Sequence, residues 1–338
     1  MKSLENGTPV VLVTGATGFI GRHLAQRLVR EGRSVRLWVR DPQRLPSSLL
    51  QSGAAVVVGD LNDPEARLRA LSGGVQQVFH CAANVHTWDR WEAYYATNVA
   101  GVRGLVEAIV AQGPAYPRLI HLSTMDVYGF PLEPCDESCT PTGGEFGYGR
   151  SKWQGEQIVR ERCSAAGIPF TILRPGNVIG PGSQFITRMG KELRRGLMMT
   201  VDGGQIHAGL LFVDNLVNYL LWAAEAPQTV GECFNVRDPG EVTWGQFIRD
   251  FKQAIGGHGW VVNLPFGVAD GLSRLSAGVL GRILSGEPLL HPLLVRLFGR
   301  TCGHSGKKIE NASGFAGSVT YPEALARSVH WFQNECPL

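Results

Sequence analysis

The chain has 338 residues, of which 44% are hydrophobic, and its formal net charge is +3. This composition supplies a large apolar core, predicts one large domain or two closely packed ones, and shows no basic patch for nucleic acid. The seven cysteines stand in no metal-ligand spacing, so we expect reduced thiols and no bound metal.

Residues 1–9 are polar and lack the apolar core of a secretory signal. No uninterrupted apolar run reaches the roughly 18 residues that a membrane span needs. We therefore expect a cytoplasmic protein without a membrane span.

A glycine-rich turn follows the first predicted strand, residues 10–14. Gly15, Gly18 and Gly21 stand at three-residue intervals, and apolar residues at helical spacing continue to Gly32. In such a strand–turn–helix unit the glycines permit a tight turn, a close approach to a pyrophosphate and close packing of helix on strand. The free N–H groups of the helix then face the phosphates. The spacing differs by one residue from the common dinucleotide fingerprint, and it predicts a dinucleotide site.

Strand and helix signals alternate from residue 10 to about residue 180 and then loosen. This alternation is typical of a parallel sheet with helices on both faces. We predict an α/β fold with a doubly wound parallel sheet of Rossmann type over residues 1–180, and a smaller C-terminal substrate lobe over residues 181–338. Strands are predicted at 10–14, 34–39, 55–58, 77–81, 118–123 and 169–174, and a helical segment at 91–111.

Tyr148 and Lys152 are four residues apart in a segment with a helical pattern, so their side chains share one face. Such a pair is common by chance, but here it lies downstream of the glycine turn at the distance that a doubly wound sheet needs. Ser123 and Thr124 lie between these two motifs, at the carboxyl end of a predicted strand, where ligands of open α/β sheets bind.

Together these segments resemble the extended short-chain dehydrogenases/reductases over nearly the whole chain, and fit best the branch of 3β-hydroxysteroid dehydrogenase-like and dihydroflavonol reductase-like enzymes. The resemblance implies that residues 205–230 return to the first domain. The matching motifs are the turn at 14–21, Asp60-Leu61, Cys81-Ala82-Ala83, the N-V-x-G at 98–101, Thr124 with Tyr148 and Lys152, the segment 173–181, the V-x-D element at 212–215 and the last helix at 321–332.

The resemblance also assigns roles to single residues. Thr124, Tyr148 and Lys152 are the expected catalytic residues. Val85, Asp126, Asn177 and His207 are expected to contact the substrate. The expected cofactor contacts are Gly15, Thr17, Gly18, Phe19, Ile20, Arg40, Asp60, Leu61, Ala82, Ala83, Ser123, Tyr148, Lys152, Pro175, Asn177 and Val178.

The expected chemistry is hydride transfer coupled to proton transfer. A tyrosine hydroxyl has an ordinary pKa of ~10, and a neighbouring Lys152 ammonium favours the phenolate. Tyr148 would exchange a proton with the substrate oxygen, while Thr124 holds that oxygen in place.

The cofactor is chosen at the end of the second strand, where an acidic residue binds the ribose 2′-OH of NAD and an arginine accommodates the 2′-phosphate of NADP. Arg40 is the first residue after the strand, so we expect NADP(H). Asp41 keeps NAD(H) as the alternative.

The substrate class follows from a departure from the family pattern. Nucleotide-sugar enzymes usually carry an arginine just before the V-x-D element, but residues 207–211 contain none. Residues 264–300 are rich in Leu, Val and Phe, and predict amphipathic helices that cover the pocket or touch a lipid surface. We therefore predict an oxidoreductase that interconverts a hydroxyl and a carbonyl group on a hydrophobic, steroid-like or lipid-like substrate. The alternatives are a nucleotide-sugar epimerase or dehydratase with tightly held NAD, and a non-catalytic NADP-binding regulator. We expect a homodimer.

Overall fold

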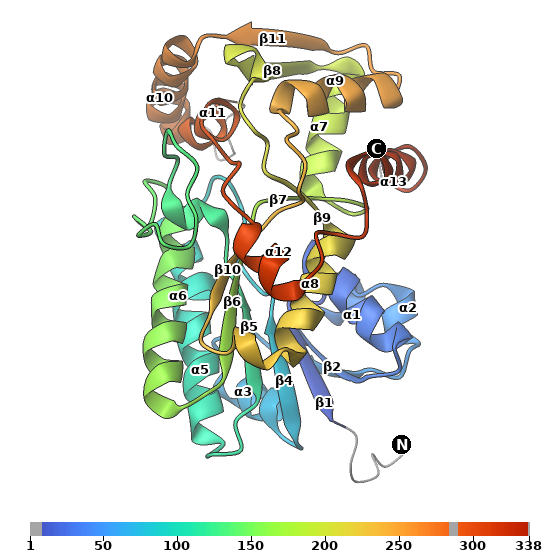
Figure 1. Ribbon diagram of the computed structural model, residues 1–338, viewed down its shortest axis with the longest axis vertical. Coiled ribbons are helices and arrows are strands. Elements are labelled where there is room, and N and C mark those ends of the chain that lie inside the picture. The colour runs from blue at the N-terminus through green and yellow to red at the C-terminus, as the bar shows by residue number, and fades with distance from the viewer. Residues whose placement is uncertain (1–8, 284–289, 337–338) are drawn as a thin grey trace.

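The computed structural model describes residues 9–283 and 290–336. Its central element is a seven-stranded sheet in which every neighbouring pair of strands is parallel (Figure 1). The chain starts inside the sheet and winds outward in both directions, which makes the sheet doubly wound. In spatial order the strands are β10 (Cys233–Val236), β6 (Phe170–Pro175), β5 (Arg118–Leu122), β4 (Val75–His80), β1 (Val10–Thr14), β2 (Ser34–Val39) and β3 (Ala55–Val58).

The predicted fold class is confirmed. All six predicted strands are present, and their ends are shifted by two residues at most. The seventh strand, β10, comes from the C-terminal half of the chain and was not predicted. Its four residues include the polar Asn235, so they form no apolar run or alternation that sequence patterns detect.

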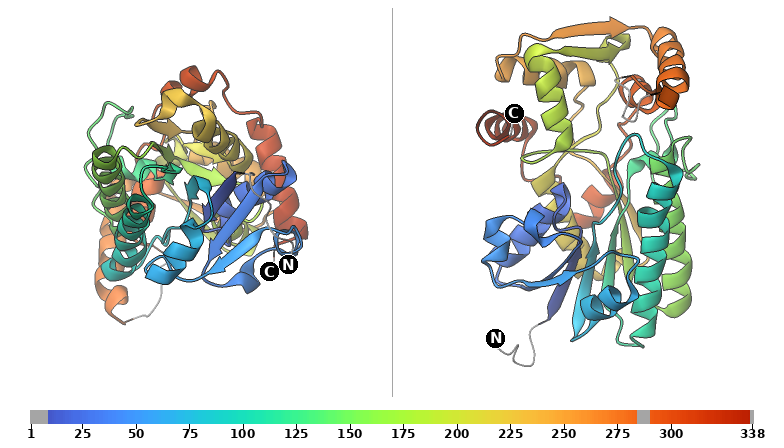
Figure 2. Two further views of the ribbon diagram at one scale, coloured as in Figure 1. Left: turned by 90° about the horizontal axis from the view of Figure 1, so that it is seen from below. Right: turned by 180° about the vertical axis from the view of Figure 1, so that it is seen from behind.

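Helices cover both faces of the sheet (Figure 2). Each helix buries one apolar stripe against the strands, which is the arrangement that the alternating pattern predicts. One face carries α3 (Pro64–Leu71), α5 (Val102–Ala111) and α6 (Gly147–Ala166), whereas the other carries α1 (Phe19–Arg30), α8 (Val213–Glu225) and α12 (Lys307–Ser313), with the short α2 (Ser47–Leu50) beside α1.

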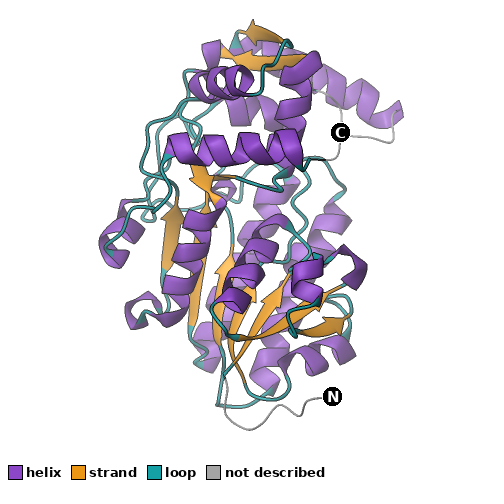
Figure 3. Cartoon of the chain, turned by 90° about the vertical axis from the view of Figure 1, so that its right-hand side faces the viewer, coloured by secondary structure: helices purple, strands orange, loops and turns teal. Residues whose placement is uncertain are grey.

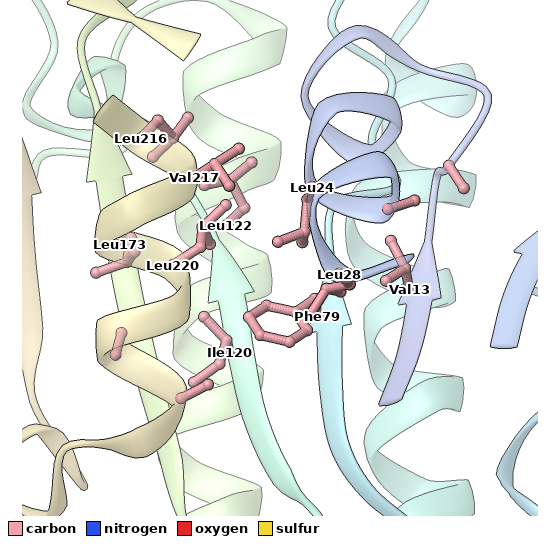
Figure 4. Close-up of a cluster of buried hydrophobic side chains, with 14 of the residues drawn as sticks. Val13, Leu24, Leu28, Phe79, Ile120, Leu122, Leu173, Leu216, Val217 and Leu220 are labelled. Carbon is pink, nitrogen blue, oxygen red and sulfur yellow. The ribbon is translucent and has the colours of Figure 1, made fainter. Parts of the chain in front are cut away.

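The core under α1 and α8 fixes the position of the glycine turn. Figure 4 shows Leu24 and Leu28 of α1 and Leu220 of α8 gathered with Phe79 and Ile120 of the sheet. All five side chains are fully buried, and each large apolar side chain contributes about 1.5–3 kcal/mol when it leaves water. The start of α1 is therefore held rigidly at the carboxyl edge of the sheet.

The predicted helical segment 91–111 is divided into three parts. It consists of α4 (Trp91–Tyr94), a π-helical turn at Tyr95–Gly101, and α5. Such π-helical turns occur frequently at functional sites, because they redirect single side chains. Here the turn contains Asn98, whose contacts are described below.

The C-terminal lobe lies beyond the carboxyl edge of the sheet (Figure 3). Two small parallel sheets organise it, with a core of packed aromatic side chains that includes Trp244, Phe247 and Phe332. Its elements are β7 (Asn177–Ile179) paired with β9 (Leu210–Phe212), β8 (Leu197–Val201) paired with β11 (Trp260–Leu264), and the helices α7 (Gln184–Arg195), α9 (Trp244–Ala254), α10 (Phe266–Ile283), α11 (Pro292–Gly299) and α13 (Tyr321–Asn334).

The Leu-rich segment 264–300 contributes α10 and α11, while its residues 284–289 lie outside the described part of the chain. Within the described residues, no helix combines the length and the apolar character that crossing a bilayer requires. The division of the chain at residue 180 stays a prediction, which limited proteolysis would test.

Candidate functional site

The glycine turn joins β1 to α1 at the carboxyl edge of the sheet. Gly15 has a φ of 73°, and a Cβ there would lie 2.7 Å from the backbone nitrogen of Ala82. A Cβ on Gly21 would lie 2.3 Å from the carbonyl oxygen of Gly15. Both positions therefore need glycine for packing alone.

Gly18 is different, because a Cβ there would meet only the carbonyl oxygen of Gly15, at 3.2 Å, and otherwise the adjoining cavity. It is the residue before α1, and no side chain caps the helix. The N–H groups of the first turn, from Phe19 and Ile20 onward, are thus left for another acceptor. An anionic phosphate suits this position, since the helix dipole is positive there.

The residues directly after β2 are the ones expected to determine whether the protein prefers NADP(H) or NAD(H). Arg40 is exposed directly after the strand. The carboxylate of Asp41 accepts a hydrogen bond from the backbone N–H of Gln43 at 3.0 Å, so it caps the turn that follows. Arg44, at the end of this turn, lines the large cavity beside the glycine turn. Arg44 was not among the predicted cofactor contacts, although its spacing of four residues from Arg40 was a usable signal.

The expected adenine contacts lie at the end of β3. Asp60 accepts hydrogen bonds from the backbone and side-chain nitrogens of Asn62, at 2.9 and 3.1 Å, and Leu61 is buried. At the end of β4, the backbone of Ala82 donates to the hydroxyl of Thr14 at 3.2 Å. This bond holds the Ala82 segment against the glycine turn.

Thr124, Tyr148 and Lys152 come together at the end of β5 and the start of α6. The Lys152 ammonium donates to the carbonyl oxygen of Leu122 at 2.6 Å and is buried. Burial lowers the pKa of Lys152 to about 8, while the negative charge of Glu156 acts in the opposite direction.

Burial raises the pKa of Tyr148 above its ordinary value, while the neighbouring Thr124 side chain has a smaller effect that lowers it. The negative charge of Asp126 raises it further. The pKa of Asp126 itself is raised to about 6 by burial. The free protein therefore holds Tyr148 as the neutral phenol at neutral pH.

Asn98 connects the π-helical turn to the catalytic helix. Its amide nitrogen donates to the hydroxyl of Ser151 and to the carbonyl oxygen of Asn84, both at 2.9 Å, and its oxygen accepts from the backbone of Asn84 at 2.8 Å. Ser151 in turn donates to the carbonyl oxygen of Tyr148 at 2.7 Å. Asn98 thus positions the segment after β4 relative to the catalytic tyrosine.

A buried ion pair anchors α6 to β6. The guanidinium of Arg174 makes two hydrogen bonds to the carboxylate of Glu156, at 2.8 and 2.7 Å, and a third to the hydroxyl of Tyr128 at 2.7 Å. Both charged side chains are almost fully buried. This pair was not predicted from the sequence, because its partners lie on different elements and in no known spacing.

A cavity of about 800 Å³ extends from the glycine turn into the lobe. Thr17, Gly18, Phe19 and Val85 line it at the sheet, so this expected substrate residue and three expected cofactor residues share one space. Its other part, the lobe groove, lies between α7, β8, β11 and α11. The walls of the lobe groove include Phe185, Met199, Leu264, Leu294, Leu297 and Phe298.

Tyr94 connects the cavity to the catalytic helix. Its hydroxyl donates to the carbonyl oxygen of His86 at 2.5 Å, and its ring lies 2.8 Å from where a Cβ on Gly147 would stand. His86 lines the cavity, and Gly147 precedes Tyr148. The segment that contains Val85 and His86 therefore lies between the cavity and the catalytic residues, which are close to each other.

Asn177 and Asp126 border a second, small cavity together with Gly176 and His304, after the end of β6 at Pro175. The amide nitrogen of Asn177 donates to the carbonyl oxygen of Ala208 at 2.7 Å, which fixes its direction. Val178 packs against the buried clusters of both the sheet and the lobe.

The structure does not place His207 at a cavity with the other expected substrate residues. One ring nitrogen accepts from the backbone of Gly209 at 2.8 Å, and the other lies 2.9 Å from the carbonyl oxygen of Gly240 and 3.2 Å from the Arg237 guanidinium. Neither of the two described cavities includes it. These partners engage both ring nitrogens of His207, and its expected contact with the substrate stays a prediction.

Among the residues that the structure describes, no cluster of His, Cys, Asp and Glu side chains has the geometry of a metal site.

Comparison with known proteins agrees with this geometry. Residues 11–236 match the family model described as the NAD dependent epimerase/dehydratase family. The chain belongs to this family. The expected class of enzyme, an NAD(P)-dependent oxidoreductase of the extended short-chain type, is thereby confirmed.

Two curated relatives extend along nearly the whole chain. A 2-alkyl-3-oxoalkanoate reductase of Stenotrophomonas maltophilia is 27% identical, covering 94% of this chain and 97% of the relative. A 4-hydroxy-2-methyl-3-oxo-4-farnesyl-3,4-dihydroquinoline-1-oxide ketoreductase of Stigmatella aurantiaca is 29% identical and covers 93% of both chains.

Among solved structures, the UDP-glucose 4-epimerase of Thermotoga maritima, determined with UDP-glucose, superimposes with a TM-score of 0.76. It is 22% identical and covers 96% of this chain and 98% of its own. This likeness shows the shared fold.

Proposed function

We propose that this protein is an NADP(H)-dependent oxidoreductase that interconverts a hydroxyl and a ketone or aldehyde group on a hydrophobic substrate. The observation that carries the proposal is the shared cavity: its sheet end is the glycine turn, and its lobe end is walled by apolar side chains such as Met199, Leu264 and Leu294. One space therefore offers a phosphate-binding end and an apolar end, next to the half-buried Tyr148 and the buried Lys152.

The residues at the sheet end fit a dinucleotide. The uncapped start of α1 at Gly18 would hold the pyrophosphate, and Arg22 and Arg44, which line the same space, add positive charge. Arg40 and Arg44 would hold a 2′-phosphate through charge-assisted hydrogen bonds. The carboxylate of Asp41 caps its own turn, so it is less available to bind the ribose 2′-OH of NAD(H). When bound, the dinucleotide would supply or accept the hydride.

The proton chemistry rests on the chain's own side chains. In the reducing direction Tyr148 donates its phenolic proton to the carbonyl oxygen of the substrate, and Thr124 holds that oxygen by a hydrogen bond. Because the pKa of Tyr148 is raised in the free protein, the proton is present when the ketone arrives. The Lys152 ammonium would stabilise the phenolate that remains.

The relatives support the same substrate class. The names of the two relatives described above are those of reductases, one of a 2-alkyl-3-oxoalkanoate and one of a compound with a farnesyl group. The homodimer and the cytoplasmic location stay predictions, and light scattering in solution would test the first of them.

A nucleotide-sugar epimerase or dehydratase is the second candidate. Asn177, which matches a diphosphate contact of those enzymes in the family pattern, borders the small cavity beside Asp126 and thus favours it. Against it stand the apolar side chains that β8 and β11 present to the cavity and the engaged ring of His207. Burying a diphosphate without a cationic partner is costly.

The test combines one variant with two substrate classes. The natural protein should oxidise NADPH with apolar ketones and should bind no UDP at micromolar concentrations in calorimetry. Tyr148→Phe should keep cofactor binding and lose at least about 100-fold in turnover. Tight UDP binding would favour the epimerase, and near-normal turnover of Tyr148→Phe would exclude the assigned proton donor.

A further inference from the structure

The lobe groove is lined mainly by apolar side chains and is adaptable in shape. Helices α7 and α11 and strands β8 and β11 contribute Phe185, Met199, Leu264, Leu294 and Phe298 to its walls. Met189 and Met198 also line it. Methionine side chains are unbranched and flexible, so a wall with three of them conforms to ligands of variable shape. A rigid ligand of one defined shape does not need such a wall.

The outer end of the groove opens through an apolar rim. Leu197 and Val262 line the cavity and yet are 63% and 40% exposed. The neighbouring Trp260 on β11 is 79% exposed. A ligand that fills the groove can therefore extend past its outer end over apolar surface, without placing its carbon chain against a ring of polar groups.

The charges of the cavity do not interrupt this path. Arg22 and Arg44 lie at the sheet end, with the glycine turn. Arg188 and Glu192 of α7 also line the cavity, but they pair with each other at 3.2 Å and add no net charge. The cavity thus has a cationic end and an apolar, open end, which matches an elongated substrate whose reacting carbonyl lies near the sheet.

We infer that the substrate carries a linear, flexible apolar tail, such as an alkyl or prenyl chain, and that the lobe groove binds this tail. The inference rests on the proposed function for the reacting carbonyl and narrows its substrate class. A compact fused-ring ketone would leave the open end of the groove unfilled and would gain less from burial.

The experiment measures NADPH-dependent reduction of methyl ketones with n-alkyl chains of increasing length, beside a steroid ketone. Each methylene that enters the groove should raise kcat/KM about four-fold, until the groove is filled. Leu294→Trp, which places an indole ring on the groove wall, should flatten this dependence on chain length. Leu264→Trp is the second blocking variant, in case the first does not fold.

The matched control is Leu272→Trp, the same substitution on α10 at a side chain that is 47% exposed and does not line the cavity. It should keep the full dependence on chain length. A second readout does not need turnover: the longest ketone should bind the natural protein in calorimetry with a negative heat-capacity change, and Leu294→Trp should abolish this binding.

The outcomes separate the two proposals. Reduction of short ketones without a gain from chain length, or a preference for the steroid ketone, would overturn the tail inference and leave the proposed function standing. Binding of the long ketone that Leu294→Trp abolishes, without reduction of any ketone, would support the tail site and overturn the proposed function. Neither binding nor reduction would overturn both.

Discussion

Neutralising Glu156 should destabilise this protein by about 3 kcal/mol or more, because its partner Arg174 would stay buried without a counter-charge. The two side chains are 0% and 2% exposed and share two hydrogen bonds of 2.7 and 2.8 Å. Glu156→Gln keeps the shape of the side chain, so no cavity is added to the loss of charge. One of its amide N–H groups would face the guanidinium N–H groups and leave that contact without an acceptor.

Lys152 lies one helical turn before Glu156 on α6, and the negative charge of Glu156 raises the pKa of Lys152 against the effect of burial. Removing this charge should lower the pKa of Lys152 further below about 8. If the Lys152 ammonium supports ketone reduction, activity falls as the pH rises through this pKa. The alkaline limb of the pH profile should therefore move to lower pH in Glu156→Gln.

Urea denaturation measures the first effect and the pH dependence of kcat/KM measures the second. The matched control is Glu107→Gln, since Glu107 faces Arg162 at 4.0 Å and both side chains are more than half exposed. This exposed pair should contribute little to stability. The double variant Glu156→Gln/Arg174→Met should be more stable than Glu156→Gln, because it also removes the unpaired charge. A loss below about 1 kcal/mol in Glu156→Gln, or a double variant less stable than the single one, would refute this reasoning.

Three further perturbations test other parts of the site. Arg40→Ser and Arg44→Ser should each weaken NADPH binding about ten-fold or more and leave NADH binding nearly unchanged, as measured by dissociation constants; tighter binding of NADH than of NADPH to the natural protein would contradict the cofactor assignment. Asp126→Asn removes a negative charge that raises the pKa of Tyr148, so alcohol oxidation should reach its plateau at lower pH, whereas Asp126→Glu should keep the natural profile; identical profiles for both variants would disprove the influence of Asp126. His80 and His121 are buried and stacked with ring centroids 5.4 Å apart, and burial lowers the pKa of His80 to about 3 and that of His121 well below its ordinary value. The unfolded chain therefore binds protons at these residues that the folded chain does not, so the stability they contribute is full above pH ~6.5 and is lost as the pH falls toward about 3. His121→Phe should lose about 2 kcal/mol less of its unfolding free energy than the natural protein between about pH 7 and pH 5, and an equal loss would show that His121 is not held neutral.

The sequence by itself determined the fold and the candidate catalytic set. Strand–helix alternation, the glycine spacing and the four-residue interval between Tyr148 and Lys152 are local patterns, and local patterns follow from backbone geometry. Gly21 shows why: a side chain there would collide with the carbonyl oxygen of Gly15, which precedes it in the same turn.

Only the tertiary structure decided which distant side chains meet. Glu156 and Arg174 lie on a helix and a strand, and nothing in their separation of 18 residues marks them as partners. The lobe groove combines residues from segments near 185, 199, 264 and 294, and none of these segments has a pattern that differs from ordinary core. The sequence predicts His207 as a substrate contact, but only the structure shows that its ring nitrogens contact the backbone of Gly209 and Gly240. Such contacts form only when whole helices and strands pack together. This packing sets the distance and direction between side chains that are far apart along the chain, and local sequence patterns do not contain that information.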